Sequence, residues 1–377
     1  MTDGLLPEMA PLSGGIFAGQ GDVGPPDVMP VEFVDPINEE ALAEEVRQWK
    51  AAKEVALQRN EPEPLPPLNR GQRSMCRQLM PALWEIRRYR LRGVPRKQYA
   101  KDLEQAHQLC YCLWGAAGTG KTEMLKVLEM VMLRESLGRI VFSAWMGVAA
   151  ALLPHGMTMC SATGLSPAHF NMSSDQTAKA SQDNLTGFVA RCGKQEDVVL
   201  WVIDEMSTWG AKYLYHFGNR TCELVDGDPT VPLGGSMVLV LGDFLQLPPV
   251  GETGLYESVV RKLLTNVPSA SGKRVVPKKK KVSPLSAAGK GTTMFINFKF
   301  VRLTEQMRAR LDGQWCEWMD ALRDLTTSSP VPAALVERLK TLVLSASEMN
   351  DPQYAFASMA TVSQKEAAEY NWLMTVA

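Results

Sequence analysis

The stretch Gly115-Ala-Ala-Gly-Thr-Gly-Lys-Thr122 decides how this sequence is expected to fold. It follows the apolar run Leu109–Trp114 and precedes the helix-forming stretch Glu123–Arg134, which is the strand, loop and helix context that the Walker A pattern requires. In such a loop, glycines let backbone N–H groups turn toward phosphate oxygens at the N-terminus of a helix. The stretch therefore predicts a P-loop that binds the phosphates of a nucleotide.

The residue types within the loop have separate expected roles. Lys121 would supply a point charge to the β- and γ-phosphates, and the hydroxyl of Thr122 would bind Mg²⁺. A glycine-rich turn without a ligand is the alternative, which the combination of strand, loop, lysine and hydroxyl disfavours. The predicted nucleotide-binding residues of the loop are Gly115, Gly118, Thr119, Gly120, Lys121 and Thr122.

Four apolar runs predict a parallel sheet around this loop. They alternate with helix-forming stretches, and continuous apolar runs are typical of strands covered by helices on both faces. The runs are Leu109–Trp114, Arg139–Ala144, Val198–Ile203 and Met237–Leu241. The sequence therefore predicts an α/β fold.

Two carboxylates follow the third apolar run. Asp204 and Glu205 would lie at the carboxyl end of that strand, which is the edge of a parallel sheet where ligands bind. Asp204 is predicted to hold Mg²⁺, and Glu205 is predicted to polarise the attacking water as a general base. A helix cap followed by a first-turn charge is the alternative, but a Walker A pattern in the same chain favours catalysis.

A second polar pair follows the fourth run, in Gly242-Asp-Phe-Leu-Gln-Leu-Pro-Pro249. Gln246 could sense the γ-phosphate, and Asp243 could orient water or a neighbouring strand end. A Gly-Asp turn ended by two prolines is an equally good interpretation from the residues alone.

Composition bounds the class of protein. The chain has 377 residues, 45% of them hydrophobic, and a formal net charge of -1. A net charge near zero gives no overall attraction to nucleic acid, so a DNA-binding surface would have to come from local clusters. The cysteines lack paired CxxC spacing, so no zinc site is expected. No run approaches the roughly 18 apolar residues of a membrane span, so no membrane partner is expected.

Shifts in composition predict four regions. We expect a disordered acidic and Pro-rich tail with one helix, an ATP-binding domain, a basic Lys-rich insertion and the start of a second domain. Their predicted bounds are 1–66, 67–265, 266–293 and 294–377.

Two local features of these regions lead to further predictions. Asn38 could cap a helix from Glu39 to Gln58, in which apolar residues recur at helical spacing. The run Lys278–Lys281 resembles a short nuclear-import signal, which would favour the nucleus in a eukaryotic host. It could also contact DNA phosphates or be a solvated loop.

Four segments together resemble one branch of DNA helicases. They are the Walker A loop, Ile203-Asp-Glu-Met-Ser207, Gly242-Asp-Phe-Leu-Gln-Leu-Pro-Pro-Val250 and Leu303-Thr-Glu-Gln-Met-Arg308. They are similar to the PIF-one and RecD-like branch of superfamily-one helicases, which includes the helicase part of Helitron transposases, and the resemblance covers roughly residues 68–373.

The resemblance implies both a fold and an activity. The implied fold is a P-loop RecA-like parallel sheet domain followed by a second RecA-like domain. The implied activity is an ATP-dependent DNA helicase, with ATP and Mg²⁺ as cofactors, that moves 5′-to-3′ along single-stranded DNA and unwinds forked duplex DNA. Roles in DNA repair, recombination and telomere maintenance are implied as well.

The same resemblance assigns roles to residues. Gln246 would couple the nucleotide state to DNA, and Arg308 would reach the γ-phosphate from the second domain. Leu68-Asn-Arg-Gly-Gln72 is similar to the adenine-reading Q motif, in which the Gln72 amide would bind the adenine edge. Segments 143–150 and 156–161 resemble single-strand contacts, in which Trp145 could stack on bases or belong to the core.

The motifs expected late in the second domain are not found after Arg308. We therefore expect an incomplete second RecA-like domain and a chain that is truncated at its C-terminus. Two alternatives to a working helicase follow: a helicase remnant of a mobile element that binds ATP and DNA without unwinding, and a P-loop ATPase switch that acts on protein. The oligomeric state is not predicted.

Overall fold

The computed structural model describes residues 27–307, apart from 167, 172–179, 247, 250, 251, 253 and 258–285, and beyond them only 313–314, 316–317, 333–334 and 336–337. The chain divides into the units Met1–Arg308 and Ala309–Ala377. The Lys278–Lys281 run, Arg308 and most of the predicted second domain lie outside the described residues.

The core of the first unit is a six-stranded sheet with the order β3-β2-β4-β5-β1-β6. Every pair of neighbouring strands is parallel. The strands are β1 (Cys110–Gly115), β2 (Arg139–Ala144), β3 (Met157–Thr158), β4 (Val198–Asp204), β5 (Met237–Gly242) and β6 (Lys299–Leu303). The predicted α/β fold with a parallel sheet is confirmed, although the two-residue strand β3 was not predicted.

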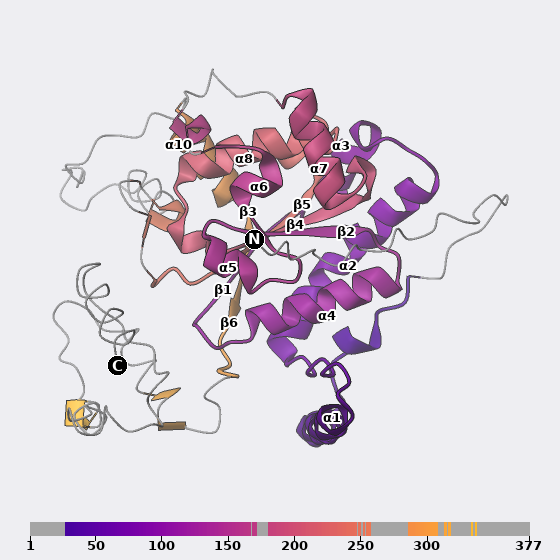
Figure 1. Ribbon diagram of the computed structural model, residues 1–377, viewed down its shortest axis with the longest axis vertical. Helices are drawn as coiled ribbons and strands as arrows, with labels where there is room; N and C mark the ends of the chain where they lie inside the picture. The colour runs from indigo at the N-terminus through magenta and orange to yellow at the C-terminus, as the bar shows by residue number, and fades with distance from the viewer. Residues whose placement is uncertain are drawn as a thin grey trace, which may run out of the picture. The chain divides into compact units, whose positions relative to one another are not determined.

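Helices cover both faces of this sheet, with α2 and α4 on one side and α8 on the other (Figure 1). The longer helices are α1 (Glu39–Arg59), α2 (Arg70–Leu91), α3 (Arg96–Ala106), α4 (Lys121–Arg134), α7 (Gln182–Cys192), α8 (Ala211–Leu224) and α10 (Ala287–Ile296). The short ones are η1 (Val31–Phe33), α5 (Gly147–Ala151), α6 (Met159–Thr163), η2 (His169–Asn171), η3 (Gln195–Asp197), η4 (Met206–Thr208) and η5 (Pro232–Gly235).

Alternation along the strands explains why the apolar runs are continuous. Successive side chains of a strand point to opposite faces. In β4, Leu200 and Val202 join the core on the α2 and α4 side, whereas Trp201 and Ile203 join the core on the α8 side. Both faces are therefore apolar, as expected for a parallel sheet between two helical layers.

The predicted N-terminal helix is present as α1. The side chain of Asn38 accepts a hydrogen bond from the N–H of Ala41, at 2.8 Å, and so caps the helix as predicted. The helix ends at Asn60, which adopts a left-handed conformation.

The segment before α1 is folded onto the first unit, so the prediction of a disordered tail is wrong there. Phe33, in η1, is fully buried against α2 and its surroundings. Arg77 of α2 donates to the Phe33 carbonyl at 2.7 Å, and Arg134 of α4 forms an ion pair with Glu32. The Arg134 hydrogen bond lowers the pKa of Glu32. The sequence did not predict this docking, because a single apolar aromatic residue among charged residues is weak evidence for folding in a segment rich in Gly and Pro.

The start of the second domain, predicted at residue 294, also needs correction. Strand β6 pairs with β1 in parallel, and α10 packs against α8, so both belong to the first unit. The predicted insertion at 266–293 accordingly overlaps the start of α10. The pairing of this strand with β1 was not predicted, because a long-range contact between parallel strands leaves no local pattern in the sequence. No described helix is long and apolar enough to cross a membrane.

Replacing Phe33 by Ala should lower the free energy of unfolding by about 3–5 kcal/mol, because a fully buried aromatic ring would leave a cavity. Val31 lies in the same short helix but is 74% exposed, so Val31→Ala is a matched control with an expected change within about 0.5 kcal/mol. Urea unfolding of both variants measures the difference. Equal unfolding midpoints would contradict the docking of this segment.

Candidate nucleotide-binding site

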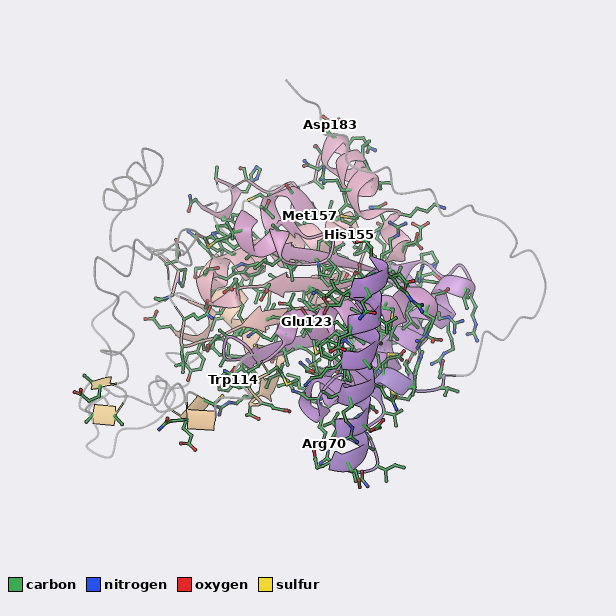
Figure 2. The ribbon with its side chains drawn as sticks, turned by 60° about the horizontal axis from the view of Figure 1, so that its bottom comes forward. Arg70, Trp114, Glu123, His155, Met157 and Asp183 are labelled. Atoms are coloured by element: carbon green, nitrogen blue, oxygen red, sulfur yellow. The ribbon has the colours of Figure 1, made fainter. Side chains whose placement is uncertain are left out.

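The predicted site residues gather at the carboxyl edge of three neighbouring strands. Strands β4, β5 and β1 are adjacent, and their last residues lead into Asp204, Gln246 and the loop 115–120 respectively. Figure 2 labels Trp114 in β1 and Glu123 in the first turn of α4, the elements on either side of the loop. A cavity of about 610 Å³ lies here, lined by Ala117, Gly118, Gly120, Lys121, Thr122, Glu123, Met146, Val148, Ala149, Leu152, Asp204, Glu205, Gln246 and Met307.

The backbone of the loop requires glycine at Gly120, the N-cap of α4. Its φ is +75°, in the left-handed region, and a Cβ there would lie 2.4 Å from Nε2 of Gln72. Helix α4 begins at the next residue, so the backbone N–H groups of its first turn start at Lys121 and Thr122. The arrangement can accept phosphate oxygens at a helix N-terminus.

Lys121 lies over its own loop. Its Nζ donates to the carbonyls of Gly115 and Ala116, at 2.9 and 3.0 Å. Burial raises the pKa of both Asp204 and Glu205, and the positive charge of Lys121 offsets part of this rise. The ammonium is therefore inside the cavity and close to the carboxylates, where it can exchange carbonyl partners for phosphate oxygens.

Both ends of the Gln72 side-chain amide, on α2, are hydrogen-bonded, and the Nε2 end contacts the loop. Its Oε1 accepts from the N–H of Asn69, and its Nε2 donates to the carbonyls of Thr119 and Gly120 at 3.2 and 3.0 Å. The Asn69 side chain accepts from the Gln72 N–H in return, which completes a capping box. The Asn-x-x-Gln spacing could have predicted this box. The adenine role assigned to Gln72 remains a prediction.

The residues after β6 also contact the loop, which the sequence did not predict. The side-chain amide of Gln306 donates to the Ala117 carbonyl at 2.9 Å, and the N–H of Met307 donates to the Gly118 carbonyl at 2.9 Å. Arg308, the residue predicted to reach the γ-phosphate, follows directly but lies outside the described residues.

Asp204 and Glu205 form a strained, partly buried acidic pair. Burial raises the pKa of each carboxyl, and the charge of Asp204 raises the pKa of Glu205 further. Glu205 has a φ of +59°, which is rare for a residue with a side chain, and its N–H donates to Oδ1 of Asp204. Backbone strain of this kind is often kept at functional sites.

Gln246 lines the cavity, and Asp243 shapes the turn that carries it. Asp243 is 3% exposed; its Oδ1 accepts from the N–H of Leu245, and its carbonyl accepts from the N–H of Gln246. Asp243 also raises the pKa of Glu205, so its carboxyl lies near the acidic pair. The turn interpretation of Asp243 is confirmed, and the role of Gln246 remains a prediction.

Trp145 belongs to an aromatic cluster beside the site. Its ring stacks on Tyr213 with centroids 4.8 Å apart and meets Phe170 edge-on. Tyr213 therefore covers one face of the ring, and Trp145 is half-buried. Trp145 was predicted either to stack on bases or to belong to the core, and the ring face that Tyr213 covers is used for packing within the protein.

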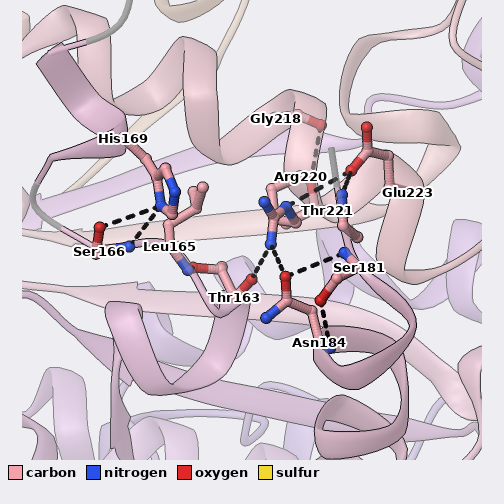
Figure 3. Close-up of polar contacts among 11 residues, drawn as sticks. Thr163, Leu165, Ser166, His169, Ser181, Asn184, Gly218, Arg220, Thr221 and Glu223 are labelled. Atoms are coloured by element: carbon pink, nitrogen blue, oxygen red, sulfur yellow. Dashed lines mark hydrogen bonds and ion pairs between the residues drawn. The ribbon is translucent and has the colours of Figure 1, made fainter. Parts of the chain in front are cut away.

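A buried arginine holds the segment that was predicted to contact single strands. Arg220 of α8 donates from Nη1 to the carbonyl of Thr163, the last residue of α6, and to Oδ1 of Asn184 in α7 (Figure 3). Asn184 and Ser181 form the capping box of α7. One side chain thus joins three helices behind the predicted contact segment.

The residues of the cavity could bind Mg²⁺ together with the phosphates of a nucleotide. Among the described residues, no group of three or more His, Cys, Asp or Glu side chains could hold a metal ion. Mg²⁺ is commonly bound by one or two protein oxygens together with substrate phosphates, and Thr122 and Asp204 offer a hydroxyl and a carboxylate in one cavity.

The parallel sheet, the glycine loop before α4 and the acidic pair at the neighbouring strand end define a P-loop nucleotide-binding domain. Within it, residues 100–276 match the family model described as PIF1-like helicase.

Similar curated proteins are ATP-dependent DNA helicases by name. The chain is 32% identical over 143 residues to Pif1 of Psychrobacter sp. (strain PRwf-1), covering 38% of this chain and 20% of that protein. It is 33% identical over 137 residues to PIF6 of Trypanosoma brucei brucei, covering 36% and 16%, and 31% identical over 160 residues to PIF1 of Saccharomyces cerevisiae (strain YJM789), covering 40% and 16%. The matched region spans a fifth or less of the length of these relatives.

Among solved structures, one match is the Pif1 helicase from Candida albicans, with 17% identity, a TM-score of 0.45 and coverage of 74% of this chain and 48% of that one. The Pif1 of Bacteroides bound to single-stranded DNA has 20% identity and a TM-score of 0.39, and the match covers 66% of this chain and 56% of that one.

Gly120→Ala should weaken nucleotide binding, because a Cβ would displace the Gln72 amide from the Thr119 and Gly120 carbonyls. Gly93→Ala is the matched control: Gly93 also has a left-handed φ, +66°, but a Cβ there meets nothing within 4 Å. Both variants should lose roughly 1–2 kcal/mol of stability from the left-handed backbone. Titration with a fluorescent ATP analogue separates them, and normal binding by the Gly120 variant would contradict the loop geometry.

Proposed function

We propose that this domain binds MgATP in the P-loop cavity and couples ATP hydrolysis to movement along single-stranded DNA in the 5′-to-3′ direction. The observation that carries the proposal is the meeting of the loop, Lys121 and the Asp204–Glu205 pair in one cavity within a PIF1-like helicase domain. Relatives that share this region are named ATP-dependent DNA helicases, which supports the activity and the DNA substrate.

Each residue of the cavity has a proposed role that follows from its chemistry. Loop N–H groups and the Lys121 ammonium hold the phosphates, while the Thr122 hydroxyl and the Asp204 carboxylate hold Mg²⁺. Mg²⁺ neutralises charge on the phosphate oxygens when it is bound. Glu205 accepts the proton of the attacking water, and its raised pKa makes the carboxylate a stronger base than an exposed one. Gln246 lines the same cavity, where its amide can respond to the γ-phosphate.

The partner we propose is single-stranded or forked DNA. The solved Pif1 structures include one bound to single-stranded DNA and one that concerns unwinding of forked duplex DNA. In a eukaryotic host, the Lys278–Lys281 run would direct the protein to the nucleus.

Steady-state ATP hydrolysis with and without single-stranded DNA tests the proposal. Glu205→Gln should lower kcat about 10²- to 10⁴-fold while MgATP still binds, because only the general base is lost. Lys121→Ala should weaken MgATP binding roughly tenfold or more, because a charge-assisted contact to phosphate is removed. Lys126→Ala is the matched control, since Lys126 lies on the same helix and pairs with Glu123 outside the loop.

The outcomes separate the candidate functions. Turnover that DNA stimulates, and that both site variants lose, supports a DNA-coupled ATPase. Turnover that single strands fail to raise favours a switch acting on protein. Equal MgATP affinity of the parent chain and Lys121→Ala would refute nucleotide binding in this cavity.

A further inference from the structure

Four consecutive carbonyls of the P-loop accept hydrogen bonds from groups outside the loop. Gln306 and Met307 donate to the carbonyls of Ala117 and Gly118, and Gln72 donates to those of Thr119 and Gly120. The donors come from two parts of the chain, the start of α2 and the residues just after β6. The loop is therefore held along its outer side from two directions.

Holding a carbonyl also orients the next N–H group. A peptide bond is planar and trans, so the carbonyl of one residue and the N–H of the next point in opposite directions. The Gln306 amide, which fixes the Ala117 carbonyl outward, thereby directs the Gly118 N–H to the other side of the loop. Gly118 lines the cavity, and loop N–H groups are the ones that bind phosphate.

The two donor groups also touch each other. The side-chain amide of Asn69, the N-cap of α2, contacts Sδ of Met307 at 3.3 Å. Met307 lines the cavity as well, so the residues after β6 lie between the cap of α2 and the phosphate site. A movement of the loop would therefore change the hydrogen bonds that Gln306 and Met307 donate to it.

We propose that Gln306 is a positioning residue for nucleotide binding: its amide holds the Ala117 peptide so that the loop is ready for phosphate, and residues 306–307 in turn respond to nucleotide. The inference rests on the proposed function, that the loop binds MgATP. If these residues favour the binding-competent loop, binding must stabilise their contacts by the same factor, because coupling between two sites is reciprocal. Residues 306–307 then connect the loop to Arg308, the next residue along the chain.

Gln306→Met tests the first half of the proposal, because Met has a similar length and no charge but cannot donate. The dissociation constant and KM for MgATP should rise roughly three- to tenfold, as expected for one lost neutral hydrogen bond, while kcat stays within about twofold. The thermal unfolding midpoint should not change, since the Gln306 bond is on the exposed side of the loop. Glu305→Gln, at the exposed neighbouring residue, is the matched control and should behave like the parent.

Hydrogen exchange of the full chain tests the second half. Adding MgATP should slow exchange of the Met307 N–H, which donates to the loop, and the effect should be smaller in Gln306→Met. Unchanged MgATP affinity in Gln306→Met, or no protection of Met307 when MgATP is bound, overturns the proposal while nucleotide binding stands. If the parent chain itself fails to bind MgATP, the proposed function falls and this inference falls with it.

Discussion

The candidate nucleotide site depends on the orientation of the peptide groups in the loop after β1, whose N–H and carbonyl groups must point in opposite directions. Phosphate binding needs N–H groups that point toward the cavity, so the carbonyls of the same peptides point away from it and need other hydrogen-bond donors. Gln72 supplies donors for two carbonyls, and Gln306 and Met307 supply one each. The left-handed Gly120 sits between these groups and leaves no room for a Cβ. The conformation of the loop therefore depends on hydrogen bonds from Gln72, Gln306 and Met307 as well as on its glycines.

The fold could be predicted from the sequence where the signal is local. Continuous apolar runs predicted β1, β2, β4 and β5 to within one residue at each end. Strands that are buried on both faces are apolar throughout, so their limits are clear in the sequence. The strand β3 has only two residues and carries no periodicity. The partner of β6 and the docking of Phe33 are long-range contacts, which no local pattern encodes.

The candidate site was predictable to a similar degree. The loop and the Asp204–Glu205 pair were expected together because parallel strands end at one edge, and the structure brings them into one cavity. The contacts of Gln72 with two loop carbonyls were not expected, since the Q-motif resemblance directs attention to the base and not to the loop. For Trp145, sequence left stacking on bases and core packing equally open, and only the position of Tyr213 distinguishes the covered face.

Charge in the cavity explains why a nucleotide would enter together with a divalent cation. Asp204 and Glu205 already repel each other, which is one reason for the raised pKa of Glu205, and Lys121 compensates only part of that charge. A triphosphate alone would add several negative charges to a partly buried space in which repulsion is poorly screened. A divalent cation held by Asp204 and Thr122 would reduce this repulsion, and Lys121 would remain available to the phosphates. Glu205 has a left-handed backbone directly after Asp204, and a cation bound there would lower the proton affinity of the Glu205 carboxylate.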